Sequence, residues 1–543
     1  MKKKRVMPQK SSHTLSNAGT VPYQQSKLQQ RLIVLFRRWW LIAAMSISIF
    51  VLATIVPPNM DEYLQYHQLA CYFFPNATEN TFREGCSGIY DLKILGKFLP
   101  LRSYLYVGFT QSLFYLPMYL LWPYYLSARV MGILALLIIT YVIHRLSRTP
   151  LWLSGLIVLC SFPVVYQCIT DRGPVIYQMA LMFVLLYMAT RPINPRRGAL
   201  IGLIIFVCIE QKAFFVNFIP AVTIVAFFLL KPVFDTSDRT ARLRMLSSLL
   251  IAAVAAAVPT LIIMTAETRY GSRYYNDLLN LKGGSPLDLS LQIANLKKHL
   301  LPYFVDLSRF ANSQYDVKDT APKLTASIWA SFLAILVIGQ VYARRISGSR
   351  RTALLISSLG AFLLSLYLIN MSPHVEQGHH YVIAFPLLLL GIAVSVEYIY
   401  RHRRGLAVFL VVMTAVLNIA IAYKTVQTPT HWHDDWSKVK VLDYLRQDDI
   451  ASQYVYVIPD WGIYCLFALY GSKRQIVLYI DPLTPSDITT VASIAQRRNR
   501  GHLLIAQRST FANSRLINAS YPTLKLVTYP GYSDNDAWMI KAE

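Results

Sequence analysis

The sequence predicts a polytopic α-helical membrane protein with about eleven transmembrane helices, followed by a C-terminal α/β domain. Of the 543 residues, 55% are hydrophobic and only 15% are charged, and the mean hydropathy is +0.39. Many apolar runs approach the length of about 20 residues that crosses a bilayer as a helix. After Tyr423 these runs stop and shorter, strand-like segments begin. Together these observations exclude a soluble globular protein.

The N-terminal region sets the orientation of the predicted spans. Residues 1–38 are polar and basic, which predicts a disordered cytoplasmic segment rather than a cleaved signal peptide. The apolar run 39–56 is then the first span and leads from inside to outside. The following loop, residues 57–127, is therefore expected on the outer face, and residues 39–423 form one transmembrane module.

The apolar segment 104–122 decides the rest of the topology. It is rich in Tyr and is interrupted by Pro117. If it crossed the membrane, the later basic loops would fall outside, against the positive-inside rule, so we expect it to lie in the interface or to re-enter. The C-terminus is then outside. The predicted spans are 39–56, 127–144, 151–167, 174–190, 198–211, 213–230, 246–266, 324–343, 352–370, 381–400 and 405–423.

Residues 424–543 are predicted to form the extracytoplasmic α/β domain. Its expected strands are β-branched and aromatic runs, and its expected helices have apolar residues at helical spacing with Asp or Ser near their starts. No glycine-rich phosphate-binding loop follows the first strand. The expected strands are 453–459, 475–480, 502–507 and 523–528, and the expected helices are 434–445 and 486–497.

The formal net charge of +25 does not indicate a nucleic-acid partner. The Lys and Arg residues fall mostly in short loops between apolar spans, and no basic stripe with interleaved aromatic residues is present. Membrane lipids are the expected partners. The six cysteines lack the paired spacing of a zinc site. Cys71 and Cys86 share the predicted outer loop, where either a disulfide or two small buried side chains would fit.

Polar residues that could take part in catalysis or binding gather on the predicted outer face. Asp61 and Glu62 directly follow the first span, and charge beside hydrocarbon is usually kept for a function. An ordinary polar loop after a membrane helix is the alternative interpretation. His374 and Glu376 stand close to His379 and His380, but their spacing matches no closed metal signature.

In this order the residues resemble the GT-C superfamily of glycosyltransferases that use polyprenyl-phosphate sugars, in the branch of protein O-mannosyltransferases and aminoarabinose transferases. The likeness covers residues 39–423. It consists of one membrane helix, the Asp61–Glu62 pair in a long outer loop, and Arg129 at the start of the second span. Asp171 at the outer end of a span, a Lys212 turn and the His379-His380-Tyr381 start of a later helix complete it.

The resemblance implies a role for several residues. Asp61 would be the general base that deprotonates the acceptor, with Glu62 in support. Asp171 would orient the acceptor or, with Asp61, hold a divalent metal ion where one is used. Lys212 departs from the Lys-Gly-Pro turn of the family, because Ala213 and Phe214 follow it. The residues expected to contact substrate are Arg129, Lys212, Arg269, Arg273, His379 and His380.

The implied partners are a polyprenyl-phosphate sugar donor and a lipid, glycan or protein acceptor, most simply at a bacterial inner membrane. A transporter or flippase is an alternative function, but it would usually show repeated halves and broken helices with charges at mid-membrane depth. A polymerase or ligase of lipid-linked glycans shares the expected outer-face chemistry. The sequence does not specify the sugar or the acceptor.

Overall fold

The structure of the protein is a computed structural model, which describes the residues that follow. These are residues 27–56, 58, 62, 65–66, 69, 91–94, 97–100, 102–104, 107–170, 173, 175–191, 194–234, 238–269, 289–311, 321–344, 349–370, 378–427, 439–440, 442–443, 445–447, 451–458, 461–471, 476–479, 485–507, 525–527 and 537–541.

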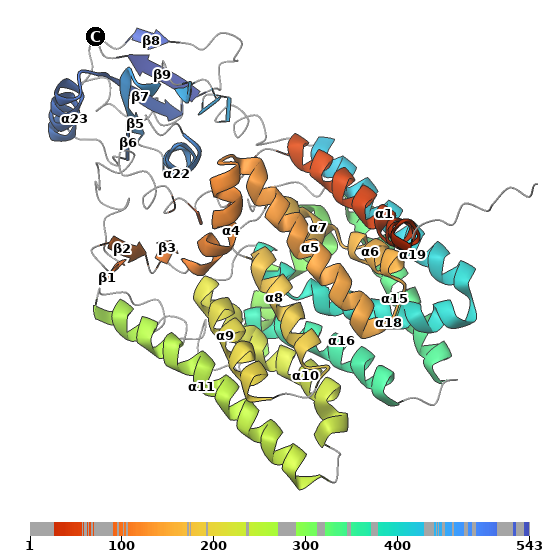
Figure 1. Ribbon diagram of the computed structural model, residues 1–543. Helices are drawn as coiled ribbons and strands as arrows, with labels where there is room; N and C mark the ends of the chain where they lie inside the picture. The colour runs from red at the N-terminus through yellow and green to blue at the C-terminus, as the bar shows by residue number, and fades with distance from the viewer. Residues whose placement is uncertain are drawn as a thin grey trace, which may run out of the picture.

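Long apolar helices form most of the molecule, and a small sheet lies at one end of them (Figure 1). Among the described residues, six helices are long and apolar enough to cross a membrane, and a bent pair would make a seventh. Helix α18 is the central one, since its apolar segment is wholly buried. The main helices are α1 (Lys27–Ile55), α5 (Tyr125–Ser147), α6 (Leu151–Leu159), α7 (Phe162–Thr170), α8 (Val175–Met188), α9 (Pro195–Gln211), α10 (Ile219–Phe234), α11 (Arg239–Arg269), α15 (Pro322–Arg344), α16 (Ser349–Asn370), α18 (Phe385–His402) and α19 (Arg404–Gln427).

Short helical segments connect these long helices. They include 3-10 helices, one π-helical turn and short α-helices. The segments are η2 (Ala213–Phe218), α13 (Leu289–Asn295), η3 (Leu296–Leu300), α14 (Leu301–Val305), η4 (Leu307–Ala311) and α17 (Gly378–Val382). All eleven predicted spans coincide with helical segments, although the number of true crossings stays a prediction.

The first helix begins earlier than predicted. Helix α1 starts at Lys27, so residues 27–38, predicted to be disordered, are helical. Strong helix formers such as Leu28, Gln29 and Leu32 fill this stretch, and no Pro or Gly interrupts it. Helix propensity therefore outweighs the polar and basic character of this stretch.

The predicted span 151–167 is broken. Helices α6 and α7 meet at Cys160 and Ser161 with a bend of 85°. Pro163 lies in the first turn of α7, where its missing N–H costs least. The backbone N–H of Phe162 donates to Oδ1 of buried Asn418 on α19 at 2.8 Å. This contact satisfies a backbone group that the break removes from the helical pattern.

The Tyr-rich segment 104–122 does not form a span. It contains the end of strand β3 (Arg102–Tyr104), strand β4 (Val107–Gly108) and helix α4 (Thr110–Leu121). A helix of 12 residues is about 18 Å long, well short of the hydrocarbon thickness of about 30 Å. The structure thus supports the expectation that this segment does not cross. Strands β3 and β4 pair antiparallel, as do β1 (Asp91–Ile94) and β2 (Lys97–Pro100).

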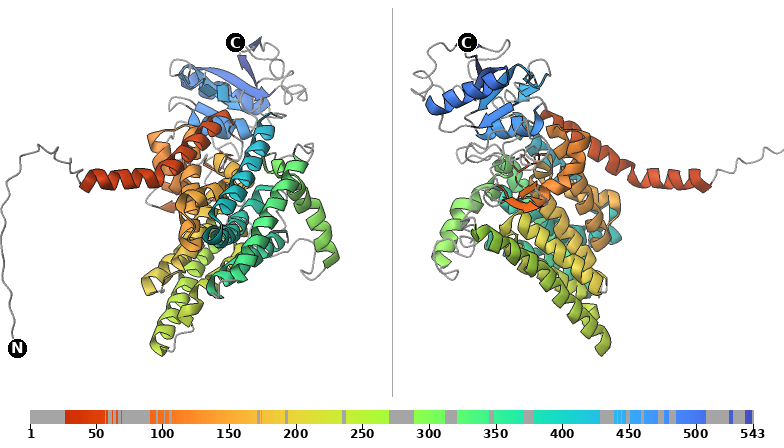
Figure 2. Two further views of the ribbon diagram at one scale, coloured as in Figure 1. Left: turned by 90° about the vertical axis from the view of Figure 1, so that its right-hand side faces the viewer. Right: turned by 60° about the vertical axis from the view of Figure 1, so that its left-hand side comes forward.

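The C-terminal segment contains a five-stranded sheet of order β6-β5-β7-β9-β8. The three strands β6, β5 and β7 are parallel, and β9 and β8 complete the sheet by antiparallel pairing. Four strands lie where the sequence predicted them, whereas β9 and α22 were not predicted. The elements are β5 (Tyr454–Ile458), α22 (Trp461–Tyr470), β6 (Ile476–Tyr479), α23 (Pro485–Arg497), β7 (Gly501–Gln507), β8 (Lys525–Val527) and β9 (Ala537–Lys541). Both views of Figure 2 place this sheet at one end of the helical region.

Helices α9 and α11 pack closely because glycine faces backbone at two points. A Cβ atom at Gly198 would lie 2.2 Å from the carbonyl oxygen of Ser248, and one at Gly202 would lie 2.3 Å from that of Ala252. Small residues at such contacts are typical of helix pairs in a bilayer, where close packing takes over from the hydrophobic effect. Helix α11 otherwise presents large apolar side chains outward, including Leu246, Leu250 and Leu261.

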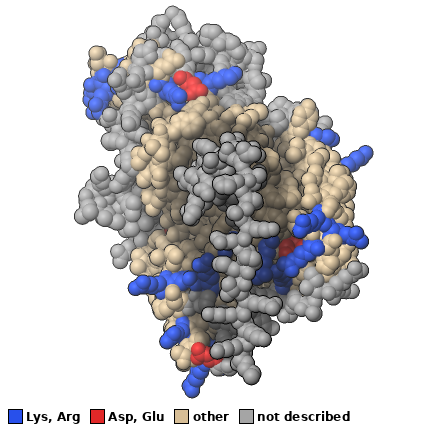
Figure 3. Space-filling model, turned by 45° about the vertical axis from the view of Figure 1, so that its right-hand side comes forward, with Lys and Arg blue, Asp and Glu red and all other residues tan. Residues whose placement is uncertain are grey.

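Charged side chains are distributed as expected for a membrane protein. Figure 3 shows a broad zone of uncharged residues that separates Lys and Arg of the C-terminal domain from a group of Lys and Arg lower on the same face. The four cysteines that the structure describes, Cys160, Cys168, Cys208 and Cys465, are buried free thiols. Cys71 and Cys86 lie outside the described residues, so their predicted pairing stays open.

We expect Gly202→Ala to destabilise the protein by about 1–3 kcal/mol, because the new methyl group must displace the α11 backbone. Thermal unfolding of the purified protein in detergent would measure the change. Gly360→Ala on α16 is the matched control, since a Cβ atom there meets nothing within 4 Å. Equal unfolding temperatures for both variants would contradict the close α9–α11 contact.

The predicted topology places residues 377 and 481 outside the cell and the positions near Arg197 and Arg403 inside. Single cysteines at these positions, in a protein with Cys71 and Cys86 changed to Ser, would report this with a membrane-impermeant maleimide. We expect labelling at 377 and 481 in intact cells and at the two Arg positions only after permeabilisation. The reverse pattern would invert the topology.

Candidate active site

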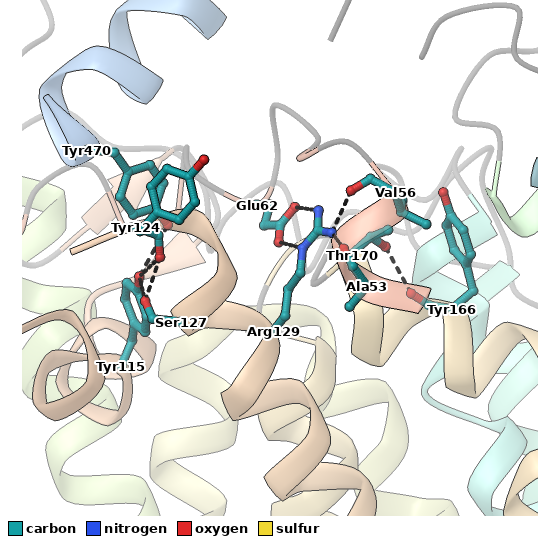
Figure 4. Close-up of polar contacts among 10 residues, drawn as sticks. All are labelled: Ala53, Val56, Glu62, Tyr115, Tyr124, Ser127, Arg129, Tyr166, Thr170 and Tyr470. Carbon is teal, nitrogen blue, oxygen red and sulfur yellow. Dashed lines mark hydrogen bonds and ion pairs between the residues drawn. The ribbon is translucent and has the colours of Figure 1, made fainter. Parts of the chain in front are cut away.

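A buried ion pair joins the predicted acidic loop to the second span. Arg129 lies near the start of α5, and both Glu62 and Arg129 are fully buried. Nε of Arg129 donates to Oε1 of Glu62 at 3.0 Å, and Nη2 donates to Oε2 at 3.2 Å. Figure 4 shows the two planar groups facing each other in this two-pronged arrangement. Bidentate pairs of this kind have fixed geometry and are the stronger class of salt bridge.

The same guanidinium group also binds the end of α1. Nη1 of Arg129 donates to the carbonyl oxygen of Ala53 and, at 2.5 Å, to that of Val56 (Figure 4). Carbonyls at a helix C-terminus lack helical partners and carry partial negative charge, so a cation there is favourable. Arg129 therefore fixes the end of α1, the start of α5 and Glu62 relative to one another.

The chain after Glu62 is held by helices α4 and α8. The carbonyl oxygen of Gln65 accepts hydrogen bonds from Nε2 of Gln111 at 3.4 Å and Oγ of Ser112 at 3.2 Å. The hydroxyl of Tyr66 donates to that of Tyr177 on α8 at 2.9 Å. The described residues on the C-terminal side of Asp61 are thus buried and fixed. Asp61 itself lies outside the described residues.

Glu210 caps helix α4, a role that the sequence did not predict. Its carboxylate accepts from the backbone N–H of Phe109 at 2.7 Å, from the N–H of Thr110 at 3.0 Å and from the Thr110 hydroxyl. An anion at a helix N-terminus satisfies orphan N–H groups and the helix dipole. A Cβ atom at Gly108 would lie 1.9 Å from this carboxylate, so glycine is required there. The only signal in the sequence was an acid at the end of an apolar helix.

The C-terminal domain docks on α4 through tyrosines. The Tyr119 hydroxyl donates to the carbonyl oxygen of Leu469 at 2.7 Å, and the hydroxyls of Tyr115 and Tyr470 lie 3.3 Å apart. Burial raises the pKa of both Tyr119 and Tyr470, so these phenols stay protonated and able to donate. The ring of Tyr115 also contacts that of Tyr66 at 4.4 Å between centroids. The domain thus reaches the segment after Glu62 through one layer of tyrosines.

Two of the other predicted site residues are buried near α8. Lys212 caps α9 and is fully buried, and its carbonyl oxygen accepts from Nε2 of Gln178 at 3.2 Å. His380 is buried in α17, which packs on α8. His379 belongs to α17 and Arg269 ends α11, but their side chains are not described. Asp171 and Arg273 lie outside the described residues.

A large apolar cavity lies between helices α8, α9, α10 and α11, with a volume of about 730 Å³. Helix α9 contributes Ile201, Ile205 and Ile209, one per turn, and Phe215 of η2 faces them. Lys212 stands in the chain between Ile209 and Phe215, at the last turn of α9. The walls of the cavity are thus apolar, and Lys212 lies in the chain segment between two of its lining residues.

No metal-binding cluster occurs within the described part of the chain, where no three His, Cys, Asp or Glu side chains are grouped. The predicted metal ligands Asp61 and Asp171 lie outside that part. The metal prediction therefore stays a prediction, and the residues described here give it neither support nor contradiction.

The sequence matches no protein-family profile, and no curated protein is significantly similar to it. Solved structures do match. ArnT from Cupriavidus metallidurans, bound to undecaprenyl phosphate, superposes with a TM-score of 0.52 at 12% identity, over 95% of this chain and 98% of that one. The chain has a GT-C fold. ArnT in its apo state gives a TM-score of 0.42 at 12% identity, over 95% of this chain and 99% of that one.

Arg129→Met should destabilise the GT-C fold of this chain by about 3–5 kcal/mol, because it leaves the buried Glu62 carboxylate without its cation. Arg129→Met combined with Glu62→Met should recover much of that loss, since neither charge then remains buried. Thermal unfolding of the purified variants would measure both effects.

Arg401→Gln is the control for the ion-pair variants. Arg401 is 45% exposed and shares Glu397 with Arg351, so its loss should cost about 1 kcal/mol or less. If Arg129→Met were no more damaging than Arg401→Gln, the pair would not hold the end of α1.

Proposed function

We propose that the chain is a membrane glycosyltransferase that moves a sugar from a polyprenyl-phosphate donor to an acceptor on the extracytoplasmic face. The observation that carries the proposal is the buried Glu62–Arg129 pair within a GT-C fold. This pair fixes the position directly after Asp61 at the end of the molecule where the C-terminal domain docks. The ArnT structure of similar fold contains undecaprenyl phosphate, which supports a lipid phosphate as the donor.

Asp61 is the proposed general base. Its neighbour Glu62 is engaged by Arg129, so the two acids of the pair have different roles. Glu62 and Arg129 act as positioning residues for the acidic loop, in place of the direct substrate contact expected for Arg129. Asp61 accepts the proton of the acceptor hydroxyl or amine as the acceptor oxygen or nitrogen attacks the sugar carbon bound to phosphate. Asp171 is the second proposed acid, which orients the acceptor.

The polyprenyl donor fits the apolar cavity. Its tail would lie along Ile201, Ile205 and Ile209, and its phosphate would lie at the end near Lys212. The Lys212 ammonium then stabilises the charge on the departing phosphate. His379, His380, Arg269 and Arg273 are proposed as further polar contacts of the donor or acceptor. The sugar and the acceptor are not assigned.

The decisive experiment uses the full-length protein in lipid nanodiscs with a panel of undecaprenyl-phosphate pentoses and hexoses. We expect release of undecaprenyl phosphate, and Asp61→Asn should reduce it roughly 100- to 10,000-fold, because an amide cannot take the proton. Thermal unfolding checks that the variant is folded. Near-normal turnover by Asp61→Asn would make the acid structural and favour a transporter or a ligase.

Lys212→Met tests the donor site in the same assay. We expect weaker donor binding and slower release, whereas Lys297→Met, at an exposed position on η3, should leave both unchanged.

A further inference from the structure

An unsatisfied amide lies at the end of α9. Gln211 is the last residue of that helix and is fully buried. Neither its Oε1 nor its Nε2 atom has a hydrogen-bond partner among the residues that the structure describes. Both a donor group and an acceptor group are therefore buried there without compensation.

A second buried amide, that of Gln178, lies at the same end of α9. Nε2 of Gln178 donates to the carbonyl oxygens of Cys208, at 2.8 Å, and Lys212, at 3.2 Å, so this side chain sits on the last turn of α9. Its Oε1 atom has no partner within the described part of the chain. Gln178 and Gln211 thus present unused hydrogen-bonding atoms at the same break between α9 and η2.

Such groups are costly in a membrane protein interior. Each buried polar group left unsatisfied costs about 1–3 kcal/mol, and an apolar side chain of similar size would avoid the cost. The functional sites of proteins are where such costs are commonly accepted. The amides therefore indicate a ligand that brings both donors and acceptors to this position.

The chemistry of two neutral amides selects the ligand. A phosphate offers acceptors only and would suit the neighbouring Lys212, whereas a hydroxyl group both donates and accepts, as a primary amide does. We propose that Gln211 and Gln178 bind hydroxyl groups of the donor sugar, beside the phosphate position at Lys212. This inference rests on the proposed function and names the residues that would recognise the sugar through its hydroxyl groups.

The sign of a stability change tests the inference without any substrate. Gln211→Leu removes an unsatisfied buried amide, so the ligand-free variant should have a Tm equal to or above that of the wild type. Gln178→Leu is the contrast, since it removes two hydrogen bonds from the end of α9 and should lower the Tm. A lower Tm for ligand-free Gln211→Leu would overturn the proposal, because the amide would then have a partner inside the protein.

Donor discrimination gives the second readout. The wild-type protein in nanodiscs should bind the best undecaprenyl-phosphate sugar of the panel more tightly than undecaprenyl phosphate alone. Gln211→Leu should lose roughly 10- to 100-fold of this preference and retain its affinity for undecaprenyl phosphate. Removal of one particular hydroxyl group from the same sugar should weaken binding of the donor to the wild type. Gln211→Leu should bind this monodeoxy donor and the intact donor equally well.

The two proposals fail separately. If the wild type releases no undecaprenyl phosphate from any donor, the proposed function fails. If the wild type turns over but Gln211→Leu keeps the full preference for the sugar-bearing donor, only this inference fails, and an ordered water would then occupy the amides. Gln211→Met, which keeps the length of the side chain, provides the same test if the leucine variant does not fold.

Discussion

The Arg129 guanidinium is the group on which the packing around the acidic loop depends. It is fully buried and holds the last carbonyls of α1, the carboxylate of Glu62 and the start of α5 at once. Isolated charges are expensive in a low-dielectric interior, so this arrangement is stable only when every partner is present. The geometry of the acidic loop is thereby coupled to the packing of the first two long helices. The position of Asp61 would then be fixed by this coupling to the helices rather than by contacts within the loop itself.

The C-terminal domain adds further contacts to the elements around the acidic loop. Its helix α22 contacts α4 through Tyr115 and Tyr119, and α4 is fixed at its start by Glu210 from α9. One short helix therefore receives contacts from the C-terminal domain, from the acidic loop and from the helix that precedes Lys212. Helix α4 therefore connects the segment after the proposed base to the helix that lines the proposed donor cavity.

The sequence predicted much of the fold because length and hydropathy of helices are local properties. The helical segments, the absence of a spanning helix in residues 104–122 and four strands of the C-terminal sheet all followed from patterns within about 20 residues. The bend between α6 and α7 was not predicted, and the partner of the backbone N–H at the break, Asn418, is far away in the chain. The site was anticipated at Glu62 and Arg129 as residues, but their pairing was not, since 67 positions separate them. Glu210 and Gln211 were visible only as polar residues at the end of an apolar helix, and Gln178 gave no sequence signal, because a single buried amide or acid has no periodic pattern.

The position of α11 beside the apolar cavity has a kinetic consequence. This helix packs through Gly198 and Gly202 on α9 and leaves the apolar cavity bounded on one side by a helix whose outward face is apolar. A long-chain lipid would enter such a cavity sideways from the bilayer and would never cross water. Its effective concentration would then be its mole fraction in one leaflet, so turnover would follow membrane composition and two-dimensional diffusion rather than the bulk amount of lipid added.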